Sequence, residues 1–440
     1  MKTSSIQRAL ALLVLCALAA CQREQRAAGP MPHHVYVWQR VWNSGVRDGL
    51  RESSPAFGEI VVLTAQISLG RQRNITRVDP DYAALLGTGK AVGLAIRISP
   101  FPGPFSADDD HSRAIVGLVR ERLAHARSSG LEPAELQIDF DCAESKLGGY
   151  RLWLKAIRAA VHPLPVCPTV LPTWLKTRSF ADLARDSGRF VLQVHSVSPP
   201  KNAEDAQPLA DPGRARVWAE EAGKLGVPFR VALPTYTYLA AFDQAGQPLG
   251  VSAEGPSSRW PSDARVVRWE SEPADLAKLV ASWTRERPAA MTGLIWYRMP
   301  VATDALNWRW LTLAAVMKGE VPRRQLRVEA SGKELADLVV INDGLQDEPL
   351  PRFVDAHWLG TRLAMADALG GYVLGSGGGM TNWIRFQRTS GASLSRLRPG
   401  QRHPIGWIRC EPPVSIRLSI PRAADPVDGG QPAPPVRDGL

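Results

Sequence analysis

Short apolar runs alternate with amphipathic stretches along the chain from His34 to Gly319. Eight of these runs are rich in Val, Ile, Leu or aromatic residues and are bounded by Gly, Pro or Ser, as buried β-strands are. They span residues 34–42, 59–68, 91–99, 135–141, 166–174, 189–197, 229–237 and 292–300.

The stretches between the runs repeat apolar residues at helical spacing. The first opens with three Asp residues at 108–110 and closes at Gly130, which are typical start and stop signals of a helix. The predicted helices span residues 108–130, 147–161, 179–188, 213–226, 272–288 and 307–320.

Repeated strand–helix units over residues 34–320 predict a TIM-type (β/α)8 barrel of the α/β class. A doubly wound open sheet is the alternative, but no GxGxxG follows the first strand, so nucleotide binding loses its main support. We expect no cofactor.

After Pro322 the pattern changes to alternating apolar and polar residues, with a turn signal at Asn342-Asp343-Gly344. Residues 325–420 therefore predict a small all-β domain, sandwich-like in build. Residues 421–440 are rich in Pro and Asp and predict a disordered tail.

The composition is that of a globular protein: the chain has 440 residues, 45% of them apolar and 22% charged. The net charge is +10, but the Arg and Lys residues are scattered among acids. We therefore expect no nucleic-acid partner.

The amino terminus resembles a bacterial lipoprotein signal. Lys2 and Arg8 precede a short apolar run, and Leu18-Ala19-Ala20-Cys21 matches a lipobox, in which the Cys carries lipid. This predicts a signal peptide at 1–20, lipidation of Cys21, a linker at 21–33 and attachment to the membrane of the cell envelope. Gln22, where an Asp would favour the inner membrane, favours the outer membrane; an ordinary cleaved signal is the alternative.

Three cysteines remain in the mature chain: Cys142, Cys167 and Cys410. They show no CxxC motif and no Cys/His spacing, so we expect no metal site. Cys142 and Cys167 fall at similar heights on neighbouring predicted strands, which leaves open a disulfide or two buried thiols.

Functional residues of such barrels lie at the carboxyl ends of the strands. Strand four ends in the acids Asp139, Asp141 and Glu144, which we take as catalytic candidates. Sugars stack on aromatic rings and need paired polar groups, so other strand-end residues are candidates for substrate binding. These are Trp38, Arg97, Gln193, His195, Tyr236, Trp296 and Arg298.

Each candidate also has a structural interpretation. An Arg97–Asp139 or Arg298–Asp141 pair would fill the barrel interior, and His195 would then be a hydrogen-bonded interior residue.

The alternating acids of Asp139-Phe140-Asp141 resemble those of glycosidases related to chitinases, in which the acids lead to a catalytic Glu. Here Glu144 lies three positions after the second Asp instead of two. The whole chain resembles a family of uncharacterised bacterial lipoproteins, a domain of unknown function with a glycoside-hydrolase-like barrel. The resemblance implies a fold and a location, and no established reaction.

Three functions follow as hypotheses. The first is a lipid-anchored protein of the envelope, facing the periplasm or the surface, that hydrolyses or otherwise processes a bacterial glycan. The second is a non-catalytic glycan-binding or scaffold lipoprotein, and a subunit of an envelope assembly is a third.

Overall fold

A computed structural model gives the fold and describes residues 25–70, 72–205, 207–253, 260–377, 382–389 and 396–421. The chain divides between Val321 and Pro322 into two compact units. The predicted signal peptide, Cys21 and the tail from Arg422 onward lie outside the described residues.

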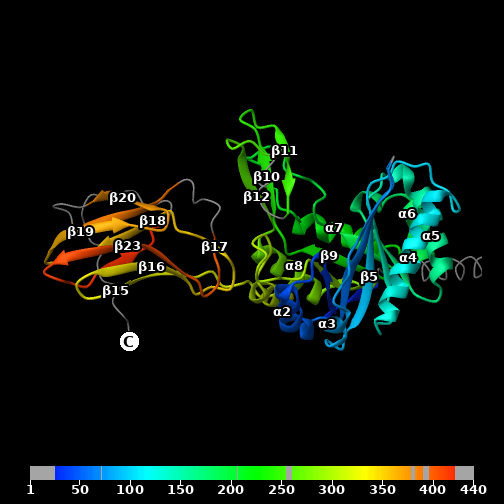
Figure 1. The fold of residues 1–440 in the computed structure, drawn as a ribbon, viewed down its shortest axis with the longest axis horizontal. Coiled ribbons are helices and arrows are strands. Elements are labelled where there is room, and N and C mark those ends of the chain that lie inside the picture. The colour runs from blue at the N-terminus through cyan, green and yellow to red at the C-terminus, as the bar shows by residue number, and fades with distance from the viewer. Residues whose placement is uncertain are drawn as a thin grey trace, which may run out of the picture. The chain divides into compact units, whose positions relative to one another are not determined.

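The first unit contains a closed barrel of eight parallel strands (Figure 1). Each strand pairs with the next, and β2 pairs with both β3 and β14, which closes the ring. The predicted (β/α)8 fold is confirmed. The strands are β2 (His33–Val37), β3 (Glu59–Ser68), β5 (Ala91–Ile98), β6 (Leu136–Phe140), β7 (Val166–Val170), β8 (Phe190–Gln193), β9 (Phe229–Pro234) and β14 (Met291–Tyr297). A short strand, β4 (Asn74–Arg77), pairs antiparallel with β3.

Helices follow the barrel strands and pack their apolar faces on the outside of the barrel. Side-chain caps start several of them: Asp109 accepts from the Ser112 N–H, and Thr177 accepts from the Phe180 N–H. The helices are α2 (Ser44–Ser53), α3 (Tyr82–Leu86), α4 (Asp110–Ser128), α5 (Leu147–Val161), α6 (Arg178–Ser187), α7 (Pro212–Gly223), α8 (Pro273–Arg285) and α9 (Trp310–Met317). The sequence pattern does not predict α2 or α3.

An ion cluster fills the barrel at the amino ends of its strands. The Arg230 guanidinium donates to Glu59 Oε2 at 2.6 Å and also to Glu135, and all three side chains are buried or nearly so. Gln137 donates to Glu135 Oε1 at 2.5 Å and accepts from the Tyr36 hydroxyl at 2.5 Å. A continuous chain of hydrogen bonds thus runs through the interior, which satisfies polar groups that burial would otherwise penalise.

An unpredicted three-stranded antiparallel sheet follows β9, and we call it the insert. It consists of β10 (Tyr238–Phe242), β11 (Pro248–Ser252) and β12 (Arg265–Trp269), with β10 in the middle. Figure 1 shows these strands extending away from the barrel. The sequence pattern did not predict the insert. Only three residues separate β9 from β10, so the apolar run of β10 merges with that of the barrel strand.

The second unit is a β-sandwich, within the residues that the structure describes. One sheet has the order β15-β16-β23-β19 and the other β20-β21-β18-β24, and one apolar core is shared between them. Two short strands, β17 and β22, pair separately. The strands are β15 (Leu326–Ser331), β16 (Ala336–Asn342), β17 (Glu348–Pro349), β18 (Phe353–His357), β19 (Arg362–Ala368), β20 (Tyr372–Gly377), β21 (Trp383–Arg388), β22 (Arg396–Leu397), β23 (Arg402–Glu411) and β24 (Arg417–Ser419).

Cys142 and Cys167 are both buried free thiols. Cys142 packs in the layer between strands and helices, whereas Cys167 belongs to the core inside the barrel. The two thiols lie on opposite sides of the barrel wall, so the fold favours two buried thiols over a bridge.

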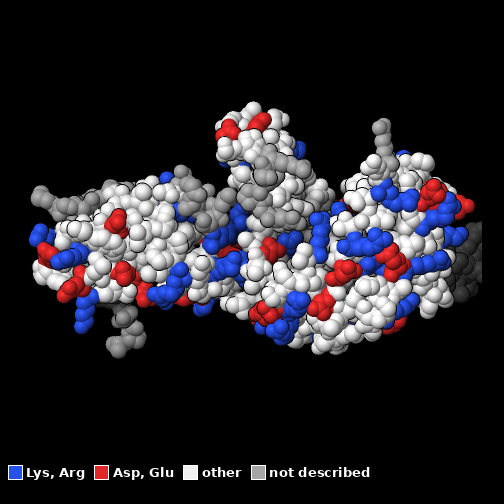
Figure 2. Space-filling model, in the orientation of Figure 1, with Lys and Arg blue, Asp and Glu red and all other residues white. Residues whose placement is uncertain are grey.

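Charges of both signs share the face of the first unit shown in Figure 2. Exposed ion pairs of the first unit include Arg77 with Glu121 at 2.7 Å and Arg127 with Glu132 at 2.8 Å. None of the helices in the described ranges combines the length and the apolar character needed to cross a membrane.

Candidate functional site

A cavity of about 320 Å³ opens at the carboxyl ends of the barrel strands. Its walls combine acids, hydroxyl and amide groups, and aromatic rings. The structure brings seven of the predicted site residues to this cavity: Trp38, Arg97, Asp139, Asp141, Gln193, His195 and Tyr236.

Arg97 holds the two acids of strand β6. Its Nη1 donates to Asp139 Oδ2 at 2.5 Å, and its Nη2 donates to Asp141 Oδ2 at 3.3 Å. The other oxygen of Asp139 accepts from the Thr169 hydroxyl at 2.9 Å, on the neighbouring strand β7. Both oxygens of the buried Asp139 are therefore occupied by donors.

Asp141 is more exposed to solvent than Asp139. Its side chain is 32% exposed, against 6% for Asp139, and it faces the cavity where β6 ends. Burial, followed by the negative charge of Asp139, raises the pKa of Asp141 to about 6. A carboxyl with such a pKa can give and take a proton near neutral pH.

Aromatic rings form one wall of the cavity. The Tyr297 ring makes edge contacts with Trp38, Tyr36 and Tyr236, at centroid distances of 5.2, 5.8 and 5.3 Å. It also stacks on the His195 ring at 5.5 Å. Tyr297 thus lies where the packed barrel interior ends and the cavity begins.

A second wall is built from uncharged polar groups of three residues. The Ser196 hydroxyl lies 2.5 Å from the Tyr236 hydroxyl and 3.4 Å from His195 Nδ1. Burial lowers the pKa of His195 to about 3, so the ring is neutral at physiological pH. Ser196 has a φ of 58°, which turns the chain into the cavity just after β8.

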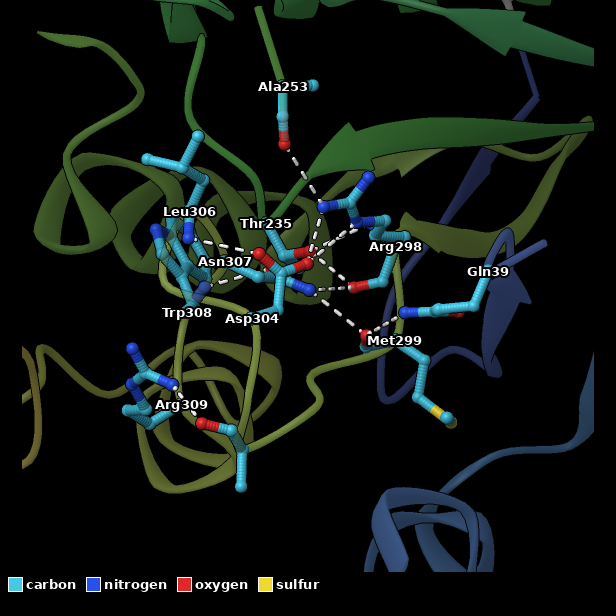
Figure 3. Close-up of polar contacts among 11 residues, drawn as sticks. Gln39, Thr235, Ala253, Arg298, Met299, Asp304, Leu306, Asn307, Trp308 and Arg309 are labelled. Carbon is cyan, nitrogen blue, oxygen red and sulfur yellow. Dashed lines mark hydrogen bonds and ion pairs between the residues drawn. The ribbon is translucent and has the colours of Figure 1, made fainter. Parts of the chain in front are cut away.

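Three predicted site residues do not line the cavity: Glu144, Trp296 and Arg298. Glu144 is exposed in the short helix Glu144–Lys146, beyond the end of β6. Trp296 alternates with the inward-facing Tyr297, so its fully buried ring points outward and donates to His33 Nδ1 at 3.0 Å. Arg298 pairs with Asp304 instead of Asp141 (Figure 3).

Other cavity residues were absent from the predicted site. Tyr36 precedes Trp38 by two positions, so strand alternation could have indicated it. Thr169 and Ser196 carry no such signal because hydroxyl residues are common at strand ends. Among the described residues, no three His, Cys, Asp or Glu side chains gather where they could hold a metal ion.

The sequence of the barrel matches a known family model. Residues 93–302 match a family described as a domain of unknown function, DUF3142. Residues 325–411, in the β-sandwich, match a second domain of unknown function, DUF8456. No curated protein matches the chain.

The chain is also similar to solved structures. A chitinase from Chromobacterium violaceum ATCC 12472 is 14% identical, with a TM-score of 0.44, over 66% of this chain and 98% of that chain. The spore cortex-lytic enzyme SleL from Bacillus cereus is 10% identical, with a TM-score of 0.46, over 67% and 75%. The GH18 chitinase ChiB from Flavobacterium johnsoniae is 8% identical, with a TM-score of 0.43, over 66% and 94%.

Removal of the Arg97 charge is expected to destabilise the barrel. Arg97→Met leaves Asp139 buried without its cation and should lower the free energy of unfolding by roughly 3 kcal/mol. The double variant Arg97→Met/Asp139→Leu should lose at least about 1 kcal/mol less than the sum of the single losses. Urea denaturation of residues 22–440 measures these energies.

The control is Arg127→Met, which breaks the exposed Arg127–Glu132 pair and should change stability by less than about 1 kcal/mol. Strictly additive losses in the double variant would contradict a buried pair between Arg97 and Asp139.

Proposed function

We propose that the barrel cavity binds a glycan and hydrolyses it with Asp141 as the proton donor. The observation that carries this proposal is the state of Asp141, a cavity-lining carboxyl whose pKa burial and Asp139 raise to about 6. Such a carboxyl is protonated in slightly acidic solution and can protonate the oxygen of a glycosidic bond.

The walls of the cavity support a sugar as the ligand. Trp38 and Tyr297 offer apolar ring surface, while Gln193, Ser196 and Tyr236 offer uncharged hydrogen-bonding groups. Sugar rings present the same combination of apolar faces and hydroxyl edges. The cavity volume of about 320 Å³ lies within the range of small-molecule sites.

The occupied oxygens of Asp139 favour a particular mechanism. A second free carboxylate would be needed as base or nucleophile, but Arg97 and Thr169 hold both Asp139 oxygens. In substrate-assisted hydrolysis, the carbonyl oxygen of the substrate's own 2-acetamido group acts as the nucleophile instead. The proposed substrate class is therefore a glycan of 2-acetamido sugars.

Hydrolysis of the glycosidic bond would proceed in two steps. Asp141 gives its proton to the glycosidic oxygen while the bond from that oxygen to C1 breaks, and the acetamido oxygen bonds to C1. The Asp141 carboxylate then takes a proton from water, whose oxygen attacks C1 and releases the acetamido group. One water molecule is consumed, and Asp141 regains its proton.

A second candidate function is glycan binding without turnover. Arg97 Nη2 lies 3.3 Å from Asp141 Oδ2, and this charge favours the ionised form of Asp141, which cannot donate a proton. In that case the ion pairs would shape a recognition site.

The location is proposed from the sequence. The Leu18-Ala19-Ala20-Cys21 segment supports a lipid anchor at Cys21, which would hold the protein at the bacterial envelope, in the outer membrane rather than the inner one. A lipid-anchored barrel would meet glycans of the cell envelope.

Substitution of Asp141 is expected to abolish turnover and retain binding. Asp141→Asn should reduce hydrolysis of 2-acetamido oligosaccharides at least about 100-fold, because the proton donor is lost. In the wild type, kcat/KM should fall as the pH rises through about 6, the pKa of Asp141, because the protonated acid is the active form. Release of reducing ends measures turnover, and calorimetry measures affinity.

The matched control is Glu144→Gln, an acid three residues away that does not line the cavity, and it should leave turnover unchanged. Full activity of Asp141→Asn would remove Asp141 from the mechanism. Binding without turnover in the wild type would favour the second candidate.

Lipidation is expected at Cys21. Cells that produce the wild type and are fed labelled palmitate should yield a labelled protein in the membrane fraction, and Cys21→Ala should yield an unlabelled one. A label that persists in Cys21→Ala would contradict the anchor. Cys410→Ala, which changes a buried thiol in the β-sandwich, serves as the control.

A further inference from the structure

Arg298 is the centre of a polar network at the end of β14 (Figure 3). Its guanidinium donates to Asp304 Oδ2 through Nη2 and, at 3.1 Å, through Nε. The side chains of the pair are only 14% and 18% exposed. The attraction within an ion pair so shielded from water is stronger than within a surface pair.

The main chain of Arg298 is held as firmly as its side chain. Its N–H donates to Thr235 Oγ1 at 2.8 Å, and its carbonyl accepts from the Thr235 hydroxyl and from Asn307 Nδ2. Thr235 is fully buried at the end of β9, and its own N–H donates to the Tyr297 carbonyl at 2.8 Å. The peptide groups on both sides of Arg298 are therefore fixed to Thr235, directly after β9.

Asp304 organises the loop after β14 through its two oxygens. Oδ2 accepts from Arg298, and Oδ1 accepts from the Leu306 N–H at 3.0 Å. Leu306 in turn accepts from the Thr237 N–H at 2.7 Å, where the chain enters the insert. The loop is thereby tied to the segment between β9 and β10.

The Arg298 guanidinium also contacts the insert directly. Arg298 Nη2 donates to the Ala253 carbonyl at 3.4 Å, just after β11, as Figure 3 shows. The middle strand of the insert, β10, begins with Tyr238, which lines the cavity. One side chain thus connects the segment that ends in Tyr297 with the sheet that carries Tyr238.

We infer that Arg298 and Asp304 are positioning residues, whose ion pair fixes the Tyr297 ring in the cavity and holds the insert, with Tyr238, beside it. Neither side chain lines the cavity, so the pair acts through the two tyrosines that do. The part of this inference that concerns ligand affinity rests on the proposed glycan-binding function, whereas the part that concerns Tyr297 does not.

The experiment uses residues 22–440 labelled with 3-fluorotyrosine, and Tyr297→Phe identifies the fluorine resonance of Tyr297. Asp304→Asn removes the charge that binds Arg298 but keeps an oxygen for the Leu306 N–H. It should shift the Tyr297 resonance and weaken the affinity for chitin oligosaccharides at least about fivefold. Asp304→Glu keeps the charge and should restore part of both.

The matched control is Asp186→Asn, which breaks the ion pair with Arg151 on the outer helices and should leave resonance and affinity unchanged. Thermal unfolding of each variant shows whether it is folded. Arg298→Lys is the second test, because a Lys cannot reproduce the planar set of donors to Asp304 and Ala253.

A Tyr297 resonance that is unmoved in both Asp304→Asn and Arg298→Lys would overturn the inference. If the wild type binds no chitin oligosaccharide, the glycan proposal fails, and the resonance alone still decides the positioning role.

Discussion

The site depends on one constraint: Arg97 forms ion pairs with both Asp139 and Asp141. Asp139 lies on β6 and Asp141 directly follows the strand, so the two acids are two residues apart and point to the same side, and Asp139 is almost fully buried. Two like charges on one buried face are costly unless cations and donors offset them. Arg97 on β5 and Thr169 on β7 supply these partners from both neighbouring strands. Because Asp139 takes the shorter contacts, Asp141 is left facing the cavity with a raised pKa.

The same principle operates at two other levels of the barrel. At the amino ends of the strands, Arg230 forms ion pairs with Glu59 and Glu135, and the hydrogen bonds continue through Gln137 to Tyr36. At the rim, Arg298 and Asp304 form a third buried pair that ties the insert to the barrel. Polar side chains therefore fill this barrel as hydrogen-bonded ion networks, and the cavity begins where the last layer of aromatic rings ends.

Sequence patterns predicted the barrel because each of its strands is a distinct apolar run with a clear boundary. They also indicated an Arg97–Asp139 ion pair as the structural interpretation of these two residues, and the structure contains this pair. The insert was missed because β10 follows β9 too closely to appear as a separate strand. Trp296 was placed in the site although strand alternation sends it outward, opposite to Tyr297. The partner of Arg298 lies in the following loop, whose path depends on tertiary contacts and not on periodicity.

The protonation state of Asp141 decides whether this residue can act as a proton donor. A titration of residues 22–440, labelled with carbon-13 at the Asp side-chain carboxyl groups and compared with Asp141→Asn, isolates the resonance of this group. The account predicts a midpoint near pH 6, because burial and Asp139 outweigh Arg97. A midpoint at or below the ordinary Asp value of about 4 would show that Arg97 dominates, and it would contradict the role of Asp141 as a proton donor.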